Sequence, residues 1–167
     1  MKMLDLLDKE QWLAFELELH HGFGMSVSIF DETNTTFTGR VEFCNDLCPR
    51  IKSEPKGLQA ICAVANQSMT AMARQERSTI IEQCDAGLAK ICVPVFNGED
   101  MIGTVSGCGR LEHGEEVDTF LIHKALECPE QEIVDLVGSV PSSSMEEIEA
   151  FAREVEKRIQ ALVQARQ

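Results

Sequence analysis

The stretch from Ser78 to Ser106 constrains the fold most, because it holds three strand candidates in close succession. These candidates are Ser78 to Glu82, Ala89 to Phe96 and Met101 to Ser106, and each is rich in β-branched or other apolar residues. Asn97-Gly98-Glu99-Asp100 joins the last two, and turn formers in so short a connection favour an antiparallel hairpin. We therefore predict a three-stranded meander in this part of the chain.

A further pair of strands is expected closer to the N-terminus. Met25 to Phe30 alternates apolar and polar residues, Asp31 to Asn34 supplies turn formers, and Thr35 to Phe43 is rich in Thr, Phe and Val. This pattern predicts a β-hairpin. Together with the meander it gives an antiparallel sheet of about five strands.

Helical periodicity and capping residues mark most of the remaining segments. The predicted helices are 9 to 20, with Asp8 as N-cap and Gly22 beyond the end, 58 to 74, and Pro129 to Val137. Residues 44 to 57 hold two prolines and should be irregular, with a short helical turn at 49 to 52. The type of the segment 117 to 126 stays open.

A last helix is predicted over about residues 144 to 165, with Ser143 and Glu146 as its capping pair. Its apolar side chains recur at alternating steps of three and four residues, and they are Met145, Ile148, Ala152, Val155, Ile159 and Leu162. Such a stripe suits a helix packed on its own domain, and it also suits a homodimer or contact with a signalling partner.

The order of elements gives an α+β class, with flanking helices, within a single domain over residues 1 to 167. No apolar run approaches the roughly 20 residues of a membrane span. The first residues lack the basic head and apolar stretch of a signal peptide, so we expect a cytoplasmic protein that does not enter membranes.

The charge and the missing motifs exclude other classes. With 28 acidic and 15 basic residues the formal charge is −13, which repels nucleic acid and anionic lipid. The sequence has no glycine-rich phosphate loop, no G-x-S-x-G elbow and no H-E-x-x-H pair. We therefore expect a binding module and not an enzyme, and a cysteine nucleophile paired with a distant histidine is the weakest alternative.

Seven cysteines carry the functional signal, and in a reducing compartment most should be free thiols. Cys92 lies within a strand and is expected to be a core residue, and Cys128 has no partner nearby in sequence. The four that lie at or beside breaks between elements are Cys48, Cys62, Cys84 and Cys108. Four thiolates suit tetrahedral zinc or an iron–sulfur cluster. Their wide spacing, however, favours dispersed buried thiols over a shared metal site.

Several of these cysteines belong to a longer pattern. It comprises Cys48-Pro-Arg-Ile-Lys-Ser-Glu-Pro-Lys-Gly57, Cys62, Cys84-Asp-Ala-Gly-Leu88, Val93-Pro-Val-Phe-Asn-Gly98 and Ile102-Gly-Thr-Val-Ser-Gly-Cys-Gly109. Over about residues 25 to 111 the chain resembles the PocR sensory domain family. The resemblance implies a PAS- or GAF-related ligand-binding fold of prokaryotic signal transduction, which senses small organic molecules such as simple diols.

The resemblance also bears on the site. Cys48, Cys62 and Cys84 match the family pattern, whereas Asp85 stands where histidine is usual and Cys108 stands where the family often has Gly-Gln. These departures remove one imidazole and add one thiol. We therefore expect a four-cysteine site for zinc or an iron–sulfur cluster, with Cys44 as a possible member or substitute.

The expected function is that of a sensor for a small organic ligand, a metal centre or both. Sensory domains of this kind usually sit beside a kinase, cyclase or DNA-binding module, and these 167 residues contain none, so a separate output protein is the expected partner. Two alternatives stay open. One is a thiol redox or, less favoured, haem sensor that uses Cys84 or Cys108, and the other is an interaction protein acting through its C-terminal helix.

Overall fold

The computed structural model describes residues 1–39 and 41–166. Its sheet contains strands β1 (Ser26–Asp31), β2 (Ile80–Gln83), β3 (Ala89–Asn97) and β4 (Asp100–Glu112) in the order β1-β4-β3-β2, and neighbouring strands are antiparallel. The two-residue strand β5 (Ser142–Ser143) adds a short parallel pairing to the end of β4. The predicted α+β class and the meander are therefore confirmed.

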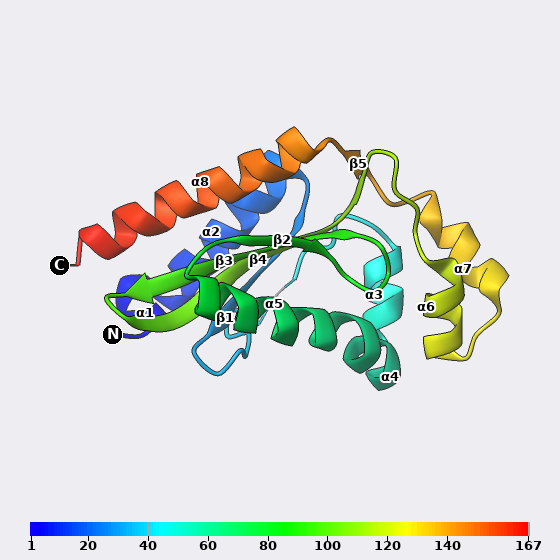
Figure 1. Ribbon diagram of the computed structural model, residues 1–167, viewed down its shortest axis with the longest axis horizontal. Helices are drawn as coiled ribbons and strands as arrows, with labels where there is room; N and C mark the ends of the chain where they lie inside the picture. The colour runs from blue at the N-terminus through cyan, green and yellow to red at the C-terminus, as the bar shows by residue number, and fades with distance from the viewer. Residues whose placement is uncertain (40, 167) are drawn as a thin grey trace.

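Helices cover both faces of this sheet (Figure 1). Helices α2 (Lys9–Phe23) and α8 (Met145–Gln164) lie on one face, and α5 (Val64–Glu76) lies on the other, continuing from a π-helical turn, η1 (Leu58–Ala63). The shorter helices are α1 (Met3–Leu6), α3 (Leu47–Lys52), α4 (Pro55–Gly57), α6 (Thr119–Leu126) and α7 (Glu130–Val137). Helices α3, α6 and α7 gather at the end of the sheet opposite the two termini.

The predicted strand from Thr35 to Phe43 is wrong. Within residues 35–39 and 41–43 the structure has a single isolated bridge, between Phe30 and Thr36. A side chain of α2 takes the place of a neighbouring strand at one point of the outer edge of β1. The amide of Ile29 donates to Glu16 Oε1 at 3.0 Å. The amide of Ile29, which a neighbouring strand could have bonded, therefore already has a buried acceptor.

Several helix ends also differ from the expectation. Asp8 caps α2 as predicted, but the helix continues through Gly22 to Phe23, and Gly24 caps its C-terminus with a φ of 62°, the left-handed conformation that glycine tolerates. Ser144 and Glu147 form the capping box of α8 in place of Ser143 and Glu146. Ser143 is unavailable because it belongs to β5 and pairs with the end of β4.

Two segments for which no long helix was predicted are helical. The open segment 117–126 contains α6, which begins after Asp118, whose side chain accepts from the amide of Leu121 at 2.9 Å. The segment 44–57, expected to be irregular, contains α3 and α4. The predicted helical turn at 49–52 is the second half of α3.

The two faces of the sheet differ in chemistry, because alternate residues of a strand point to opposite sides. The face under α2 and α8 is apolar, and its fully buried residues include Ile29, Ile91, Val95 and Val105. The apolar stripe of α8 is buried against this face through Ile148, Ala152, Val155 and Ile159. The stripe therefore packs on its own domain.

The face under η1 and α5 is polar along its centre. Lys90 of β3 lies opposite Cys108 of β4, and Ser28 of β1 lies opposite Ser106 of β4. Ser106 and Lys90 are both buried. Buried polar side chains are unusual on a sheet face, so this face is a candidate for the functional site.

Candidate functional site

A small chamber of about 40 Å³ lies between the polar face of the sheet, η1 and α3. All four predicted cysteines line it, each from a different element, and they are Cys48, Cys62, Cys84 and Cys108. Apolar side chains and two lysines, Lys52 and Lys90, complete the wall. The fold thus brings to one place thiols that are far apart in the sequence.

Hydrogen bonds around Asn45 fix the position of Cys48. Asn45 Oδ1 accepts from the amide of Cys48 at 2.7 Å, while its Nδ2 donates to the carbonyl oxygen of Gly109 at 2.7 Å and lies 3.4 Å from Cys48 Sγ. The start of α3 is thereby tied to β4. Cys62 comes from η1, the π-helical turn, and such turns often occur at functional sites.

A tight turn between β2 and β3 places Cys84. The amide of Cys84 donates to the carbonyl of Leu88 at 2.9 Å, and the amide of Gly87 donates back to the carbonyl of Cys84 at 2.8 Å. Gly87 has φ 86°, and a Cβ there would lie 2.5 Å from the carbonyl oxygen of Glu116. The glycine of the Asp-Ala-Gly motif is therefore required by both the turn and the close neighbour.

The two glycines around Cys108 have separate roles. Gly109 is the extra residue of a bulge where β4 pairs with β3, has φ 96°, and would place a Cβ 2.6 Å from Cys44 Sγ. A Cβ on Gly107 would lie 2.5 Å from the ring of Phe151 on the opposite face. Cys108 therefore lines the chamber on one face of the sheet, while its neighbour Gly107 contacts Phe151 of α8 on the other face.

Burial governs the chemistry of the chamber thiols. It raises the pKa of Cys48, Cys62 and Cys84, and neighbouring thiols raise each of them further, while the positive charges of Lys52 and Lys90 only partly oppose this at Cys62. These thiols are protonated at neutral pH and are weak nucleophiles. No histidine is among the described residues that line the chamber, so no imidazole stands beside a thiol there.

The sulfurs share a chamber but not a coordination geometry. Among the residues that the structure describes, no group of three or more His, Cys, Asp or Glu side chains is arranged to hold a metal ion. Zinc–thiolate bonds are about 2.3 Å long, so a metal would need the four thiols to move together and lose their protons. The predicted metal centre stays a prediction.

The remaining cysteines do not line the chamber. Cys92 is fully buried with Met69, Ala73 and Ile80 in a separate cluster under α5, and Cys128 packs partly buried against the cluster at the α6–α7 end. Cys44 lies at the rim, where Ser26 Oγ donates to its Sγ at 3.5 Å and its Sγ lies 3.7 Å from the carbonyl of Cys108.

A larger pocket of about 400 Å³ adjoins the chamber and shares Lys52, Cys62 and Lys90 with it. Its other walls include Ser28 of β1 and Asn66 of α5. Sequence reasoning missed both lysines and Asn66. The available signal was Lys90 itself, a charged residue within the strand Ala-Lys-Ile-Cys-Val that otherwise reads as a buried core strand.

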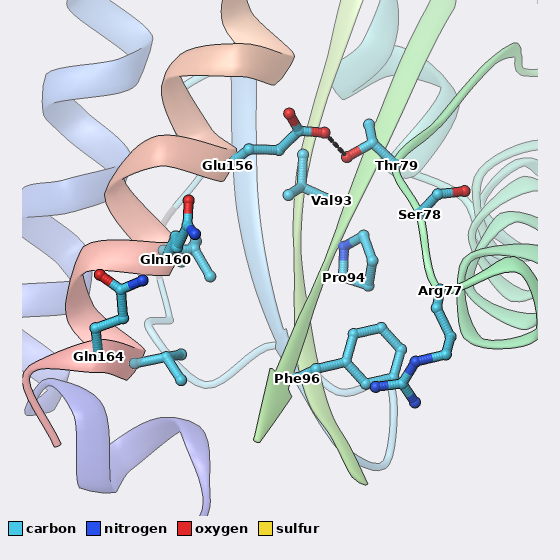
Figure 2. Close-up of a pocket in the computed structure, with 11 residues that line it drawn as sticks. Arg77, Ser78, Thr79, Val93, Pro94, Phe96, Glu156, Gln160 and Gln164 are labelled. Atoms are coloured by element: carbon cyan, nitrogen blue, oxygen red, sulfur yellow. Dashed lines mark hydrogen bonds between the residues drawn. The ribbon is translucent and has the colours of Figure 1, made fainter. Parts of the chain in front are cut away.

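Two other cavities flank α8 and have a different character. Figure 2 shows the first, of about 480 Å³, between α8 and β3. Its charged groups already have partners: Arg77 lies 4.1 Å from the centroid of Phe96 and donates to the carbonyl of Gly98 at 2.7 Å, and Thr79 donates to Glu156. The second, of about 490 Å³, lies between α8 and α2.

Comparisons with known proteins identify the chain at the level of family. Among the described residues, no helix combines the length and apolar character needed to cross a bilayer. No curated protein and no solved structure matches the sequence. One family model, described as the sensory domain found in PocR, matches residues 5–167, well beyond the stretch 25 to 111 that carries the resemblance in sequence. Since this match spans nearly the whole chain, the protein belongs to the PocR sensory domain family.

Proposed function

We propose that this sensory domain binds a small organic molecule between the polar face of the sheet and the η1–α5 helix. The ligand site comprises the cysteine chamber and the adjoining pocket. The observation that carries the proposal is that these two cavities share the wall residues Lys52, Cys62 and Lys90, on the sheet face that carries buried polar side chains. The pocket volume of about 400 Å³ suits a small molecule.

Strand β4 offers a route from this site to the C-terminal helix. Cys108 lines the chamber, and the residue immediately before it in β4, Gly107, packs closely under the ring of Phe151 of α8. A ligand that displaces β4 at Cys108 must shift this contact, since a packed core is not continuously deformable. Helix α8 is therefore the proposed output element toward a separate signalling protein or a second copy.

Filling the pocket tests the binding site. Ala63, half-buried on η1, lines the larger pocket, and Ala63→Trp should occupy it while leaving the apolar core on the far side of the sheet intact. Gln160→Trp, which fills the α8 groove of Figure 2, is the matched control. Thermal shift with two- to four-carbon diols, alcohols and carboxylates should identify ligands of the wild type and of Gln160→Trp, but not of Ala63→Trp. Equal responses of both variants would remove the site from the proposal.

A metal centre is the second candidate, favoured by the convergence of four cysteines on one chamber. Protein prepared without oxygen should then carry zinc or iron by elemental analysis, with visible absorption for an iron–sulfur cluster. Serine at any of Cys48, Cys62, Cys84 or Cys108 should release the metal, whereas Cys128→Ser should retain it. Metal-free wild-type protein, or equal metal content in all variants, would leave the chamber as a ligand site alone.

A further inference from the structure

Lys90 is a buried lysine without a partner. It lies on β3, an interior strand of the sheet, and its residue surface is only 7% exposed. Within residues 1–39 and 41–166, its ammonium group makes no hydrogen bond and no ion pair. Lysine is almost never buried unless it is paired, because an ammonium loses its hydration in the interior. The chain has 28 acidic residues, yet no described carboxylate pairs with Lys90.

A second cation faces the same space. Lys52, half-buried on α3, lines both the chamber and the larger pocket together with Lys90. Its Nζ lies 5.4 Å from the centroid of the Phe43 ring, and it makes no ion pair with a described residue. Both lysines are close enough to Cys62 to oppose the effect of burial on the pKa of its thiol. The two positive charges therefore converge on one cavity in a protein of formal charge −13.

A residue that lines the larger pocket also holds an unpartnered acceptor. Asn66, on α5, is 7% exposed, and its Oδ1 is buried without a hydrogen-bond partner among the described residues. Its orientation is fixed because Nδ2 donates to Asn34 Oδ1 at 2.7 Å. A buried carbonyl oxygen of this kind needs a donor, such as a hydroxyl or amino group.

We propose that the ligand is a small organic anion: a short carboxylate that bears a hydroxyl or amino group. This inference rests on the proposed binding site and specifies its ligand. The carboxylate neutralises Lys90 and Lys52, and the hydroxyl or amino group donates to Asn66 Oδ1. A carboxylate fits better than a phosphate, because no described arginine lines either cavity. A neutral diol would leave the ammonium of Lys90 without a counter-charge.

Matched pairs of ligands test the charge directly. Lactate and propane-1,2-diol share a carbon chain and a hydroxyl, and differ in a carboxylate against an alcohol, as do glycerate and glycerol. Calorimetric titration of the wild type should show binding of lactate or glycerate at least about tenfold tighter than of the matched alcohol. Lys90→Met and Lys52→Met should each weaken that binding by about tenfold or more, while Lys157→Met, an exposed lysine of α8, should not.

The outcomes separate this inference from the proposed site. If the alcohols bind as tightly as the acids and Lys90→Met changes nothing, the anion is wrong while the site stands. If the acids bind but Ala63→Trp does not weaken their binding, the proposed site is wrong. If neither acid binds the wild type at millimolar concentration, the anion is also wrong. Lys90→Met should fold, with an unchanged or higher melting temperature without ligand, and Lys52→Met, at a half-buried position, is the second test should Lys90→Met unfold.

Discussion

The two faces of the sheet are both buried, but they are built from different residues. The face under α2 and α8 presents aliphatic side chains to aromatic ones, such as Phe151 and Trp12, and leaves almost no exposed area. The face under η1 and α5 presents serine, lysine and cysteine. Unpartnered polar groups in an interior cost stability, so the first face holds the fold together, and the second is the face that we propose for binding.

The cavities repeat this contrast. The groove beside α8 in Figure 2 and the larger pocket under η1 have similar volumes, about 480 and 400 Å³. In the groove, Arg77 and Glu156 have partners within the protein. Under η1, Lys90 and Asn66 Oδ1 have none among the described residues. Volume alone therefore does not distinguish the two cavities, and the unsatisfied buried groups are the reason for proposing the second as the ligand site.

The largest effect is expected on the apolar face, from Phe151→Ala. Phe151 is fully buried, lies edge-on to Phe23 with ring centroids 5.5 Å apart, and packs over Gly107. Truncation leaves a cavity that the close-packed surroundings cannot fill, so the free energy of unfolding should fall by about 3 to 5 kcal/mol. Urea denaturation measures it. A loss below about 1 kcal/mol would mean that this face does not hold the fold together.

The next effect is a pH dependence at the edge of the apolar face. Burial raises the pKa of Glu16 from 4.5 to about 7, although hydrogen bonds from Thr38 and the amide of Ile29 favour its ionised form. Because the folded state holds this proton more tightly than the unfolded state, the stabilisation from Glu16 is complete below pH 4.5 and is lost as pH rises through about 7. The contribution of Glu16 to this loss is about 3 kcal/mol.

Glu16→Gln isolates this contribution from the other groups that titrate in the same range. The amide keeps an oxygen that can accept from Ile29 and Thr38 but cannot ionise. Unfolding measured from pH 4.5 to 7.5 should show a steeper decline for the wild type than for Glu16→Gln. Parallel curves for the two proteins would show that Glu16 does not titrate in this window.

The smallest effect is expected on the polar face, from Ser106→Ala. The hydroxyl of Ser106 is buried without a partner among the described residues, so its removal should leave stability unchanged or raise it by about 1 kcal/mol. The matched control is Ser144→Ala, which removes the N-cap of α8 and should cost about 1 kcal/mol. Thermal unfolding of both variants measures the difference. Equal destabilisation would show that Ser106 is a structural residue like Ser144.

The sequence predicts the meander well, because its strands and its Asn-Gly turn are local signals. It fails at Thr35 to Phe43, where strand-like composition meets an edge that Glu16 of α2 already satisfies, a contact distant in sequence. It likewise misplaces the cap of α8, since only the pairing of β5 shows that Ser143 is occupied.

In the candidate site, too, some residues can be predicted from the sequence and others cannot. The positions of Cys48, Cys62 and Cys84 follow from the family pattern, and Cys108 from its two glycines, and all four do line one chamber. Lys90 is visible in the sequence only as a charge within an apolar strand, because its burial depends on β3 lying inside the sheet. Asn66 looks like any polar residue of an amphipathic helix until its pocket is known.

A crystal structure of the protein grown with lactate tests the central claim most directly. We expect lactate between the polar face of the sheet and η1, with its carboxylate about 2.7 to 3.2 Å from Lys90 Nζ and its hydroxyl donating to Asn66 Oδ1. Lactate bound in the α8 groove of Figure 2, or a chamber that excludes it while the protein still binds it in solution, would contradict the assignment of the polar face to ligand binding.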